Sequence, residues 1–387
     1  MTTRSDAEML NNDGLNDLEG RLGLAALVCR GGVNFTYLTG LALPGTLGRH
    51  LDLTDSLRDV FVVWPFDGAP VVVASELAAA YIEANSRISD VRIYRDYRDR
   101  PADVLVSTLK GLDLSGERVG FDKSWFGANR WQEVVEQLPG MMPVDCTREL
   151  DLVRAIKSPA EIESLRRAGA VLDHAISDVF SSVKIGETER VVHARIVGRS
   201  IELGAASAHG MLQVSSNPVL YGGESDHRIL HGDLIRTDYV AYVDGYASNI
   251  SRLLYAGQPD DKILTSYQKY FAVYKASADL LRAGARAGEV HTRIQTLLAN
   301  AGFDSGLPLS GHGIGSWFHQ QYPLIVDFSS DVLTPGTVVA LEPIGGHWHL
   351  QDQFLITDGP PERLSDRFDL SYLPHIEEGE SALRPER

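Results

Sequence analysis

A strong helix-start signal near the middle of the chain divides the sequence into two parts with different patterns. Ser158 has the character of an N-cap, Pro159 occupies the first helical position, and Glu161 completes a capping box. Apolar residues then recur at helical spacing, at Ile162, Leu165, Leu172, Ile176 and Val179. A chain of 387 residues exceeds the usual size of one hydrophobic core. The sequence therefore predicts two domains, residues 1–153 and residues 154–387, the second ending in a polar tail.

The two parts differ in their secondary-structure patterns. Residues 24–30 are apolar and predict a strand, and residues 59–75 predict a hairpin. Helix-like and strand-like segments alternate after them. This alternation predicts an α/β N-terminal domain. In the second part, helices are predicted from Ser158, from Thr188 and over residues 266–283, and most segments after residue 210 are strand-like. Long helices together with antiparallel strands predict an α+β C-terminal domain.

Charge and cysteine content narrow the possible functions. The chain has 36 basic and 52 acidic residues, a net charge of −16, which argues against a nucleic-acid partner. Cys29 and Cys146 are too few for a disulfide framework and are predicted to be buried thiols. The polar, acidic N-terminus and the lack of a long apolar stretch predict a cytoplasmic protein with no membrane partner.

The second part carries polar residues in a pattern close to that of a two-metal hydrolase: Asp238, Asn249, His312, His319, Glu342 and Gln351. A two-metal site needs carboxylates that bridge the cations, because one neutral ligand cannot screen two positive charges a few ångströms apart. Asn249 and Gln351 are amides at positions where such acids are wanted. The pattern therefore predicts a metallohydrolase frame that has lost part of its metal chemistry.

Order, spacing and turn residues agree with one known superfamily over residues 20–370. The matching stretches are YLTG at 37–40, RAIKSPAEIESLRRA at 154–168, GDLIRTDYVAYVDGYASNISR at 232–252, GHGIG at 311–315 with His319, LTPGTVVALEP at 333–343 and QDQFLITDG at 351–359. Together they resemble the creatinase/aminopeptidase P/prolidase superfamily. The resemblance implies that the C-terminal α+β domain has the pita-bread fold.

The resemblance also implies roles for the polar residues. Metallopeptidases of the superfamily bind two metals through two aspartates, one histidine and two glutamates, and Asp238, His312 and Glu342 match three of these by position. Asn249 and Gln351 stand at the two bridging acids, and each amide removes a negative charge. The lost attraction is on the order of several kcal/mol at an effective dielectric of about 20. A two-metal site is therefore not expected.

Creatinases are a metal-free branch of this superfamily, and the retained titratable groups favour that branch. We expect His319 and Glu342 to act as an acid/base pair, with Asp238 and His312 positioning the substrate. The expected enzyme is a metal-independent, creatinase-like hydrolase or lyase that acts on a C–N bond of a small polar molecule. It would need no cofactor, and it would not be a conventional X-Pro peptidase.

Two other functions stay open. One divalent metal held by Asp238, His312 and Glu342 would make a mononuclear hydrolase with an open coordination position. Alternatively, the fold persists as a non-catalytic binding protein, because superfamily relatives exist in which the pita-bread domain only binds peptides or histones. The loss of two ligands is what a decayed site would look like.

Further residues are expected to contact the substrate. Asn249 and Gln351 are predicted to donate hydrogen bonds to it or to hold the pocket together. Tyr221 stands where the creatinase branch has a catalytic histidine, so it is either a phenolic acid or a packing residue. His347 and His349 lie close to the pocket by sequence, and exposed loop histidines are the favoured interpretation over a role in the site.

The resemblance also predicts an assembly. Family members are commonly homodimers in which the N-terminal domain of one subunit covers the active site of the other. The loop at residues 43–51 contains Arg49, which matches a creatinase arginine that reaches the substrate carboxylate. We therefore expect a homodimer in which Arg49 clamps an anionic group in the partner's pocket, with a plain surface arginine as the alternative.

Overall fold

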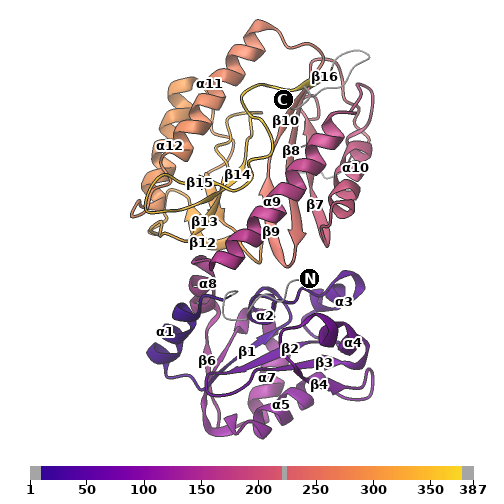
Figure 1. Ribbon diagram of the computed structural model, residues 1–387, viewed down its shortest axis with the longest axis vertical. Coiled ribbons are helices and arrows are strands. Elements are labelled where there is room, and N and C mark those ends of the chain that lie inside the picture. Colours follow the sequence, from indigo (N-terminus) through magenta and orange to yellow (C-terminus); the bar gives the residue numbers. More distant parts are fainter. Residues whose placement is uncertain (1–9, 220–224, 377–387) are drawn as a thin grey trace. The chain divides into compact units, whose positions relative to one another are not determined.

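The computed structural model describes residues 10–219 and 225–376 and divides into two compact units, Met1–Arg154 and Ala155–Arg387 (Figure 1). Tyr221 and the predicted polar tail at residues 377–387 lie outside the described residues. Among the residues described, no helix is long and apolar enough to cross a membrane.

A mixed sheet with strand order β4-β3-β2-β1-β5-β6 forms the centre of the first unit. Its strands are β1 (Ala26–Arg30), β2 (Phe61–Pro65), β3 (Val71–Ser75), β4 (Asp90–Tyr94), β5 (Arg118–Phe121) and β6 (Met142–Asp145). The antiparallel pairing of β2 with β3 confirms the predicted hairpin. Along β1, Leu27 and Cys29 belong to one apolar core and Ala26 and Val28 to another. Because successive side chains point to opposite faces, both faces of the sheet are covered, which is the α/β arrangement that the sequence predicts.

Helices supply these two covers. They are α1 (Asn12–Leu22), α2 (Val33–Thr39), α3 (Gly45–Arg49), α4 (Glu76–Asn85), α5 (Pro101–Gly111), α6 (Lys123–Phe126), α7 (Ala128–Glu136) and α8 (Thr147–Ala155). Cys29 and Cys146 are buried free thiols, as predicted.

Two antiparallel-rich sheets form the second unit. The first has the order β16-β10-β8-β7, with β9 paired to β8, and the second has the order β12-β11-β13-β14-β15. Their strands are β7 (Ser207–Val214), β8 (Leu234–Val243), β9 (Tyr246–Ile250), β10 (Leu253–Ala256), β11 (Gly311–Gly313), β12 (Gln320–Ile325), β13 (Val338–Leu341), β14 (Asp352–Leu355), β15 (Glu362–Arg363) and β16 (His375–Ile376). A β-bridge between Ser251 and Gln351 joins the two sheets, so residues about a hundred positions apart become neighbours.

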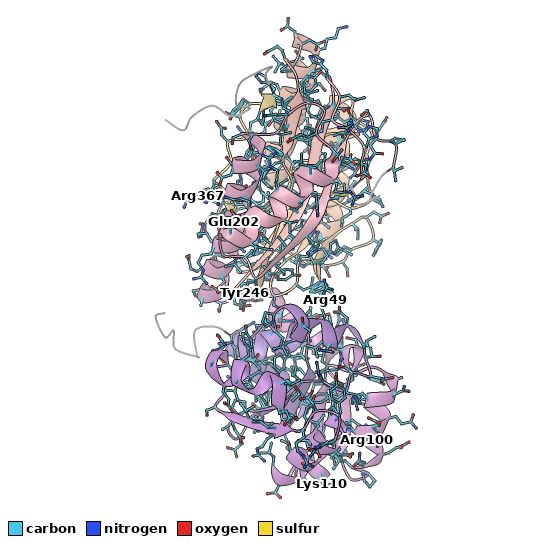
Figure 2. The ribbon with its side chains drawn as sticks, turned by 90° about the vertical axis from the view of Figure 1, so that its right-hand side faces the viewer. Arg49, Arg100, Lys110, Glu202, Tyr246 and Arg367 are labelled. Atoms are coloured by element: carbon cyan, nitrogen blue, oxygen red, sulfur yellow. The ribbon has the colours of Figure 1, made fainter. Side chains whose placement is uncertain are left out.

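Long helices accompany these sheets, which confirms the α+β prediction. They are α9 (Pro159–Phe180), α10 (Glu189–Glu202), α11 (Asp261–Ala278) and α12 (Ala287–Ala301). Helix α9 packs against β8 and β9, and α11 packs against α12 (Figure 1). The predicted capping box is present, since the Ser158 backbone N–H donates to Glu161 Oε2 at 2.8 Å and Glu161 N–H donates back to Ser158 Oγ at 3.2 Å. Tyr246, labelled in Figure 2, donates a hydrogen bond to the same Glu161 at 3.2 Å.

A buried ion network fixes the corner where the two sheets meet. Arg252 Nε donates to Asp173 on α9 at 3.0 Å, and Arg252 Nη2 donates to Asp352 on β14 at 2.7 Å. Arg252 Nη1 also donates to the backbone oxygen of Gln351 at 2.8 Å. Side chains of all three charged residues are fully buried. The network therefore holds the end of β9, which carries Asn249, next to Gln351 at the start of β14.

Candidate functional site

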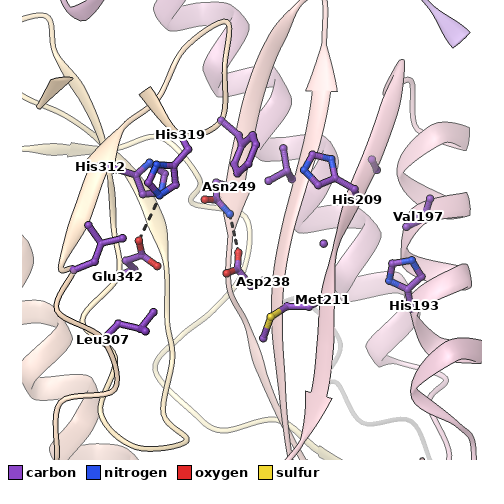
Figure 3. Close-up of a pocket in the computed structure, with 15 residues that line it drawn as sticks. His193, Val197, His209, Met211, Asp238, Asn249, Leu307, His312, His319 and Glu342 are labelled. Atoms are coloured by element: carbon purple, nitrogen blue, oxygen red, sulfur yellow. Dashed lines mark hydrogen bonds and ion pairs between the residues drawn. The ribbon is translucent and has the colours of Figure 1, made fainter. Parts of the chain in front are cut away.

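Residues from both sheets of the second unit line one pocket of about 520 Å³ (Figure 3). Its apolar wall includes Val197, Met211, Val240, Leu307, Leu309 and Phe318. Its polar end holds Asp238, Asn249, His312, His319 and Glu342. The fold thus brings most of the predicted site residues to one place, although they come from three strands and two loops of the sequence.

The two amides form a buried chain of hydrogen bonds beside the pocket. Asn249 Nδ2 on β9 donates to Asp238 Oδ1 on β8 at 2.8 Å. Gln351 Nε2 donates to Asn249 Oδ1 at 3.1 Å and lies 3.5 Å from His312 Nε2. Ser251 Oγ donates to Gln351 Oε1 at 3.2 Å. The amides therefore link Asp238 to His312 beside the pocket, and their role toward a substrate stays a prediction.

Glu342 follows β13 and is the central acid of the site. Its Oε1 lies 3.6 Å from His312 Nε2, and its Oε2 lies 3.5 Å from His349 Nε2. Burial and the nearby charge of Asp238 raise the pKa of Glu342 well above its usual range. Burial also raises the pKa of Asp238, against the effect of the hydrogen bond from Asn249. Two acids that disfavour each other's ionised form thus face the same small space.

His349 lies next to Glu342, outside the residues that line the pocket, although the sequence interpretation favoured an exposed loop position. His347 is exposed, but His349 is only 1% exposed. A tight turn in which Gly345 and Trp348 exchange backbone hydrogen bonds folds the loop back. Tyr270 then pins both ends of the loop, because its hydroxyl donates to Pro343 O at 2.7 Å and accepts from Leu350 N at 2.8 Å.

The local pattern contains one signal for this placement. His349 precedes Gln351 by two residues, and residues two apart in an extended segment point to the same face. The spacing therefore predicts that His349 and Gln351 face the same side, toward the site.

His312 and His319 lie together at the pocket. His312 lies in strand β11, where its Nδ1 donates to Gly313 O at 3.0 Å and leaves Nε2 as the acceptor. The ring of His319 stacks on it, with centroids 3.8 Å apart and planes at 19° (Figure 3). Burial, with the neighbouring His319, lowers the pKa of His312 to about 3, and burial also lowers the pKa of His319. Both rings are therefore neutral near pH 7.

Arg49 belongs to the first unit and forms a local contact there. It ends helix α3, is labelled in Figure 2, and pairs with Asp52 at 3.1 Å, with both side chains exposed. Its role as an anion clamp stays a prediction, as does the role of Tyr221, which lies outside the described residues.

The pocket has the ligand chemistry for one divalent cation. Within residues 10–219 and 225–376, two groups of three residues could each hold a metal ion. One is His312, His319 and Glu342, and the other is Asp238, Glu342 and His349. Inside each group, the potential ligand atoms all lie within 4.8 Å of one another. The trio predicted as a mononuclear site is divided between these groups, with Glu342 in both. Two carboxylates match the charge of one dication, and imidazole supplies the nitrogen donor that borderline metals prefer. Two dications would exceed the charge of the carboxylates.

Acid is expected to destabilise the metal-free protein through its buried neutral histidines. Burial lowers the pKa of His349, like that of His312, to about 3. The unfolded chain, with histidine pKa values of about 6.5, therefore binds protons first as the pH falls. The free energy of unfolding should fall by up to about 1.4 kcal/mol per pH unit for each histidine below about pH 6.5. Glu342 has the opposite effect: because its pKa is raised in the folded protein, its contribution to the free energy of unfolding increases as the pH falls toward about 4.5. Variants that lack one histidine are therefore needed to isolate the histidine effect.

The measurement is urea unfolding of the metal-free protein at about pH 7 and about pH 5. His349→Gln removes one buried imidazole, so it should lose less stability over this interval than the unmodified protein. His347→Gln changes an exposed histidine two positions away and should behave like the unmodified protein. Equal losses in all three proteins would contradict the account.

Comparisons with known proteins identify the family. Residues 163–359 match the model of metallopeptidase family M24, and residues 13–156 match that of the creatinase/prolidase N-terminal domain. The chain is 27% identical over 353 residues to a protein of Mycobacterium bovis named "Probable dipeptidase PepE", with 87% of this chain and 88% of that one covered. It is 25% identical to an Xaa-Pro dipeptidase of Lactobacillus delbrueckii subsp. lactis, with 75% and 80% covered. The structure of a prolidase from Thermococcus sibiricus matches with a TM-score of 0.79 at 20% identity, covering 97% of this chain and 100% of that one, which shows the fold.

These findings correct two expectations. The predicted metal-independent, creatinase-like function is wrong, because the matched family is a metallopeptidase family and the relatives are named dipeptidases. The expected absence of a cofactor is wrong for the same reason, since the family implies a divalent metal. The physical reason lies at the site: two acids are replaced by amides, but Asp238, Glu342 and buried imidazoles remain together as potential ligands.

Other expectations are supported in their general form. The comparisons support a hydrolase acting on a C–N bond, whereas relatives named Xaa-Pro dipeptidases conflict with the exclusion of X-Pro activity. The resemblance drawn from the motifs is confirmed over both domains. The chain belongs to metallopeptidase family M24, carries a creatinase/prolidase N-terminal domain, and has the pita-bread fold.

Proposed function

We propose that this chain is a metal-dependent peptidase that hydrolyses short peptides with one divalent cation. The observation that supports this most is the pair of acids, Asp238 and Glu342, which face one pocket with imidazole nitrogens next to them. The names of the relatives support peptides as the substrate class. The cation would be held by Glu342, Asp238 and at least one histidine.

The chain's own residues would perform the remaining steps. When bound, the cation acts as a Lewis acid toward the peptide carbonyl and lowers the pKa of a water molecule. His319 is exposed and neutral near pH 7, so it can accept a proton from the attacking water and return it to the leaving amine as the C–N bond breaks. The apolar wall formed with Met211, Leu307 and Phe318 would hold an apolar side chain of the peptide.

Hydrolysis of dipeptides, with and without proline in the second position, tests the proposal. We expect cleavage of at least one class, loss of cleavage after a chelator, and recovery on adding Co²⁺, Mn²⁺ or Zn²⁺. Cleavage that survives chelation would contradict metal dependence. Peptide binding without any turnover in the presence of metal would instead identify a non-catalytic binding protein.

We also propose, from the resemblance of residues 43–51, a cytoplasmic homodimer in which Arg49 reaches the partner's pocket. Mixing Arg49→Ala with His319→Ala should restore activity in part, because a mixed dimer carries one unmodified site. A monomer in sedimentation, or no recovery on mixing, would contradict the shared site.

A further inference from the structure

The distances around Glu342 resemble those between two ligands of one metal ion. Its carboxylate oxygens lie 3.6 Å from His312 Nε2 and 3.5 Å from His349 Nε2. A hydrogen bond between such atoms would be shorter, about 2.9 Å. Two ligand atoms on one tetrahedral ion, each about 2.1 Å from the metal, are about 3.4 Å apart. Each histidine is therefore spaced from Glu342 as a fellow ligand would be.

Ring geometry separates the two possible cation positions. A metal binds an imidazole in the plane of the ring, along the nitrogen lone pair. The rings of His312 and His319 are stacked, with centroids 3.8 Å apart and planes at 19°. Their nitrogen lone pairs therefore lie in two separate, nearly parallel planes, so one ion cannot lie in the plane of both rings. The group formed by His312, His319 and Glu342 is thus poorly arranged for a cation.

Charge favours the other group. A cation bound by Asp238 and Glu342 would neutralise the charge of both acids. A cation bound by the stacked histidines would be paired with Glu342 alone, and Asp238 would not be one of its ligands. His349 adds the nitrogen: its Nε2 lies 3.3 Å from Ser251 Oγ, a contact that a cation would replace. Its ring is held in place by the loop that Tyr270 pins. Its lowered pKa keeps it neutral, which is the form that binds metals.

We propose that His349 is a metal ligand and that the divalent cation is held by Asp238, Glu342 and His349. This inference rests on the proposed function and specifies its metal site. A ligand set with one imidazole favours a first-row transition dication such as Co²⁺ or Zn²⁺ over Mg²⁺ or Ca²⁺. The stacked pair of His312 and His319 would then be left free of the metal and able to transfer protons.

Binding of Co²⁺ to the metal-free protein, followed by its visible absorption, tests this ligand. We expect one Co²⁺ per chain with an absorption band typical of low coordination number. His349→Ala should weaken binding by more than about 100-fold, because changes in outer partners alone weaken metal sites by about 10–100-fold. His349→Gln, which keeps a polar side chain in the cavity, should also shift the absorption band. His347→Ala is the matched control and should leave affinity and spectrum unchanged.

A measurement on the unmodified protein avoids any folding defect of the variants. Anomalous scattering from crystals grown with Zn²⁺ should place the metal about 2.1 Å from His349 Nε2. A metal on His312 and His319 with His349 outside coordination distance would overturn the inference, as would His349 variants that bind Co²⁺ as tightly as the unmodified protein.

The outcomes distinguish this inference from the proposed function. Metal bound at His349 without peptide hydrolysis would support the ligand and reject the peptidase. Metal-dependent hydrolysis that His349→Ala leaves unchanged would support the peptidase and reject the ligand. A protein that binds no transition metal would reject both.

Discussion

Replacing Glu342 by glutamine is expected to lower kcat/KM for peptide hydrolysis by at least about 10³-fold, well beyond the roughly 10–100-fold effect of outer partners of a metal site. Glu342 belongs to both groups of potential ligands in the described chain, so no position of the cation avoids it. Glutamine keeps the size of the side chain but removes the charge that would face the dication. Metal affinity should fall together with activity.

Glu362→Gln is the matched control for this variant. Glu362 lies in β15 of the same sheet, and its exposed side chain pairs with Arg166 at 2.7 Å. We expect a change in kcat/KM of less than about twofold for this control, since surface pairs contribute little. A Glu342→Gln protein that binds metal and turns over peptide as the control does would show that the reaction occurs elsewhere.

Replacing Arg252 by methionine is expected to lower the free energy of unfolding of the second unit by about 3–5 kcal/mol. The substitution leaves Asp173 and Asp352 buried without the guanidinium that lies between them. It also removes the hydrogen bond to the backbone of Gln351, so the strand beside the pocket should loosen. Activity should therefore fall even at temperatures where the variant is folded.

Hydrogen exchange in increasing urea, measured on peptides from β8 and β9, reports on this unit separately from the first. Arg190→Met is the control, because Arg190 and Asp226 form an exposed pair at 2.9 Å. Its expected effect is below about 1 kcal/mol. If Arg252→Met and Arg190→Met proved equally stable, the buried network would not hold the two sheets together.

Local patterns in the sequence predict much of the fold. The capping box at Ser158 and Glu161, the hairpin of β2 and β3, and the strand-rich second half all depend on residues close together in the chain, and the structure contains them. Helix α11 begins before the predicted segment, and α12 was not predicted. The sequence of α12 contains Gly288 and Thr292, which favour helix weakly, and packing against α11 overrides that preference.

The sequence predicts several residues of the candidate site, but it does not predict their metal chemistry. Motif spacing identified Asp238, His312 and Glu342, and the structure brings them to one pocket. The position of His349 depends on the bridge between Ser251 and Gln351 and on Tyr270, contacts between residues far apart in sequence. Local sequence patterns do not predict those contacts. From the sequence alone, the two amides therefore indicate a site without metal, because the nitrogen of His349 next to Glu342 is not foreseen.

The number of metal ions needed for activity tests the central claim most directly. Metal-free protein is titrated with Co²⁺, and dipeptide hydrolysis and bound metal are measured in the same samples. A one-cation peptidase predicts that activity rises in proportion to bound metal and reaches its plateau at one equivalent per chain. Full activity in the metal-free protein, or a plateau only at two equivalents, would contradict it.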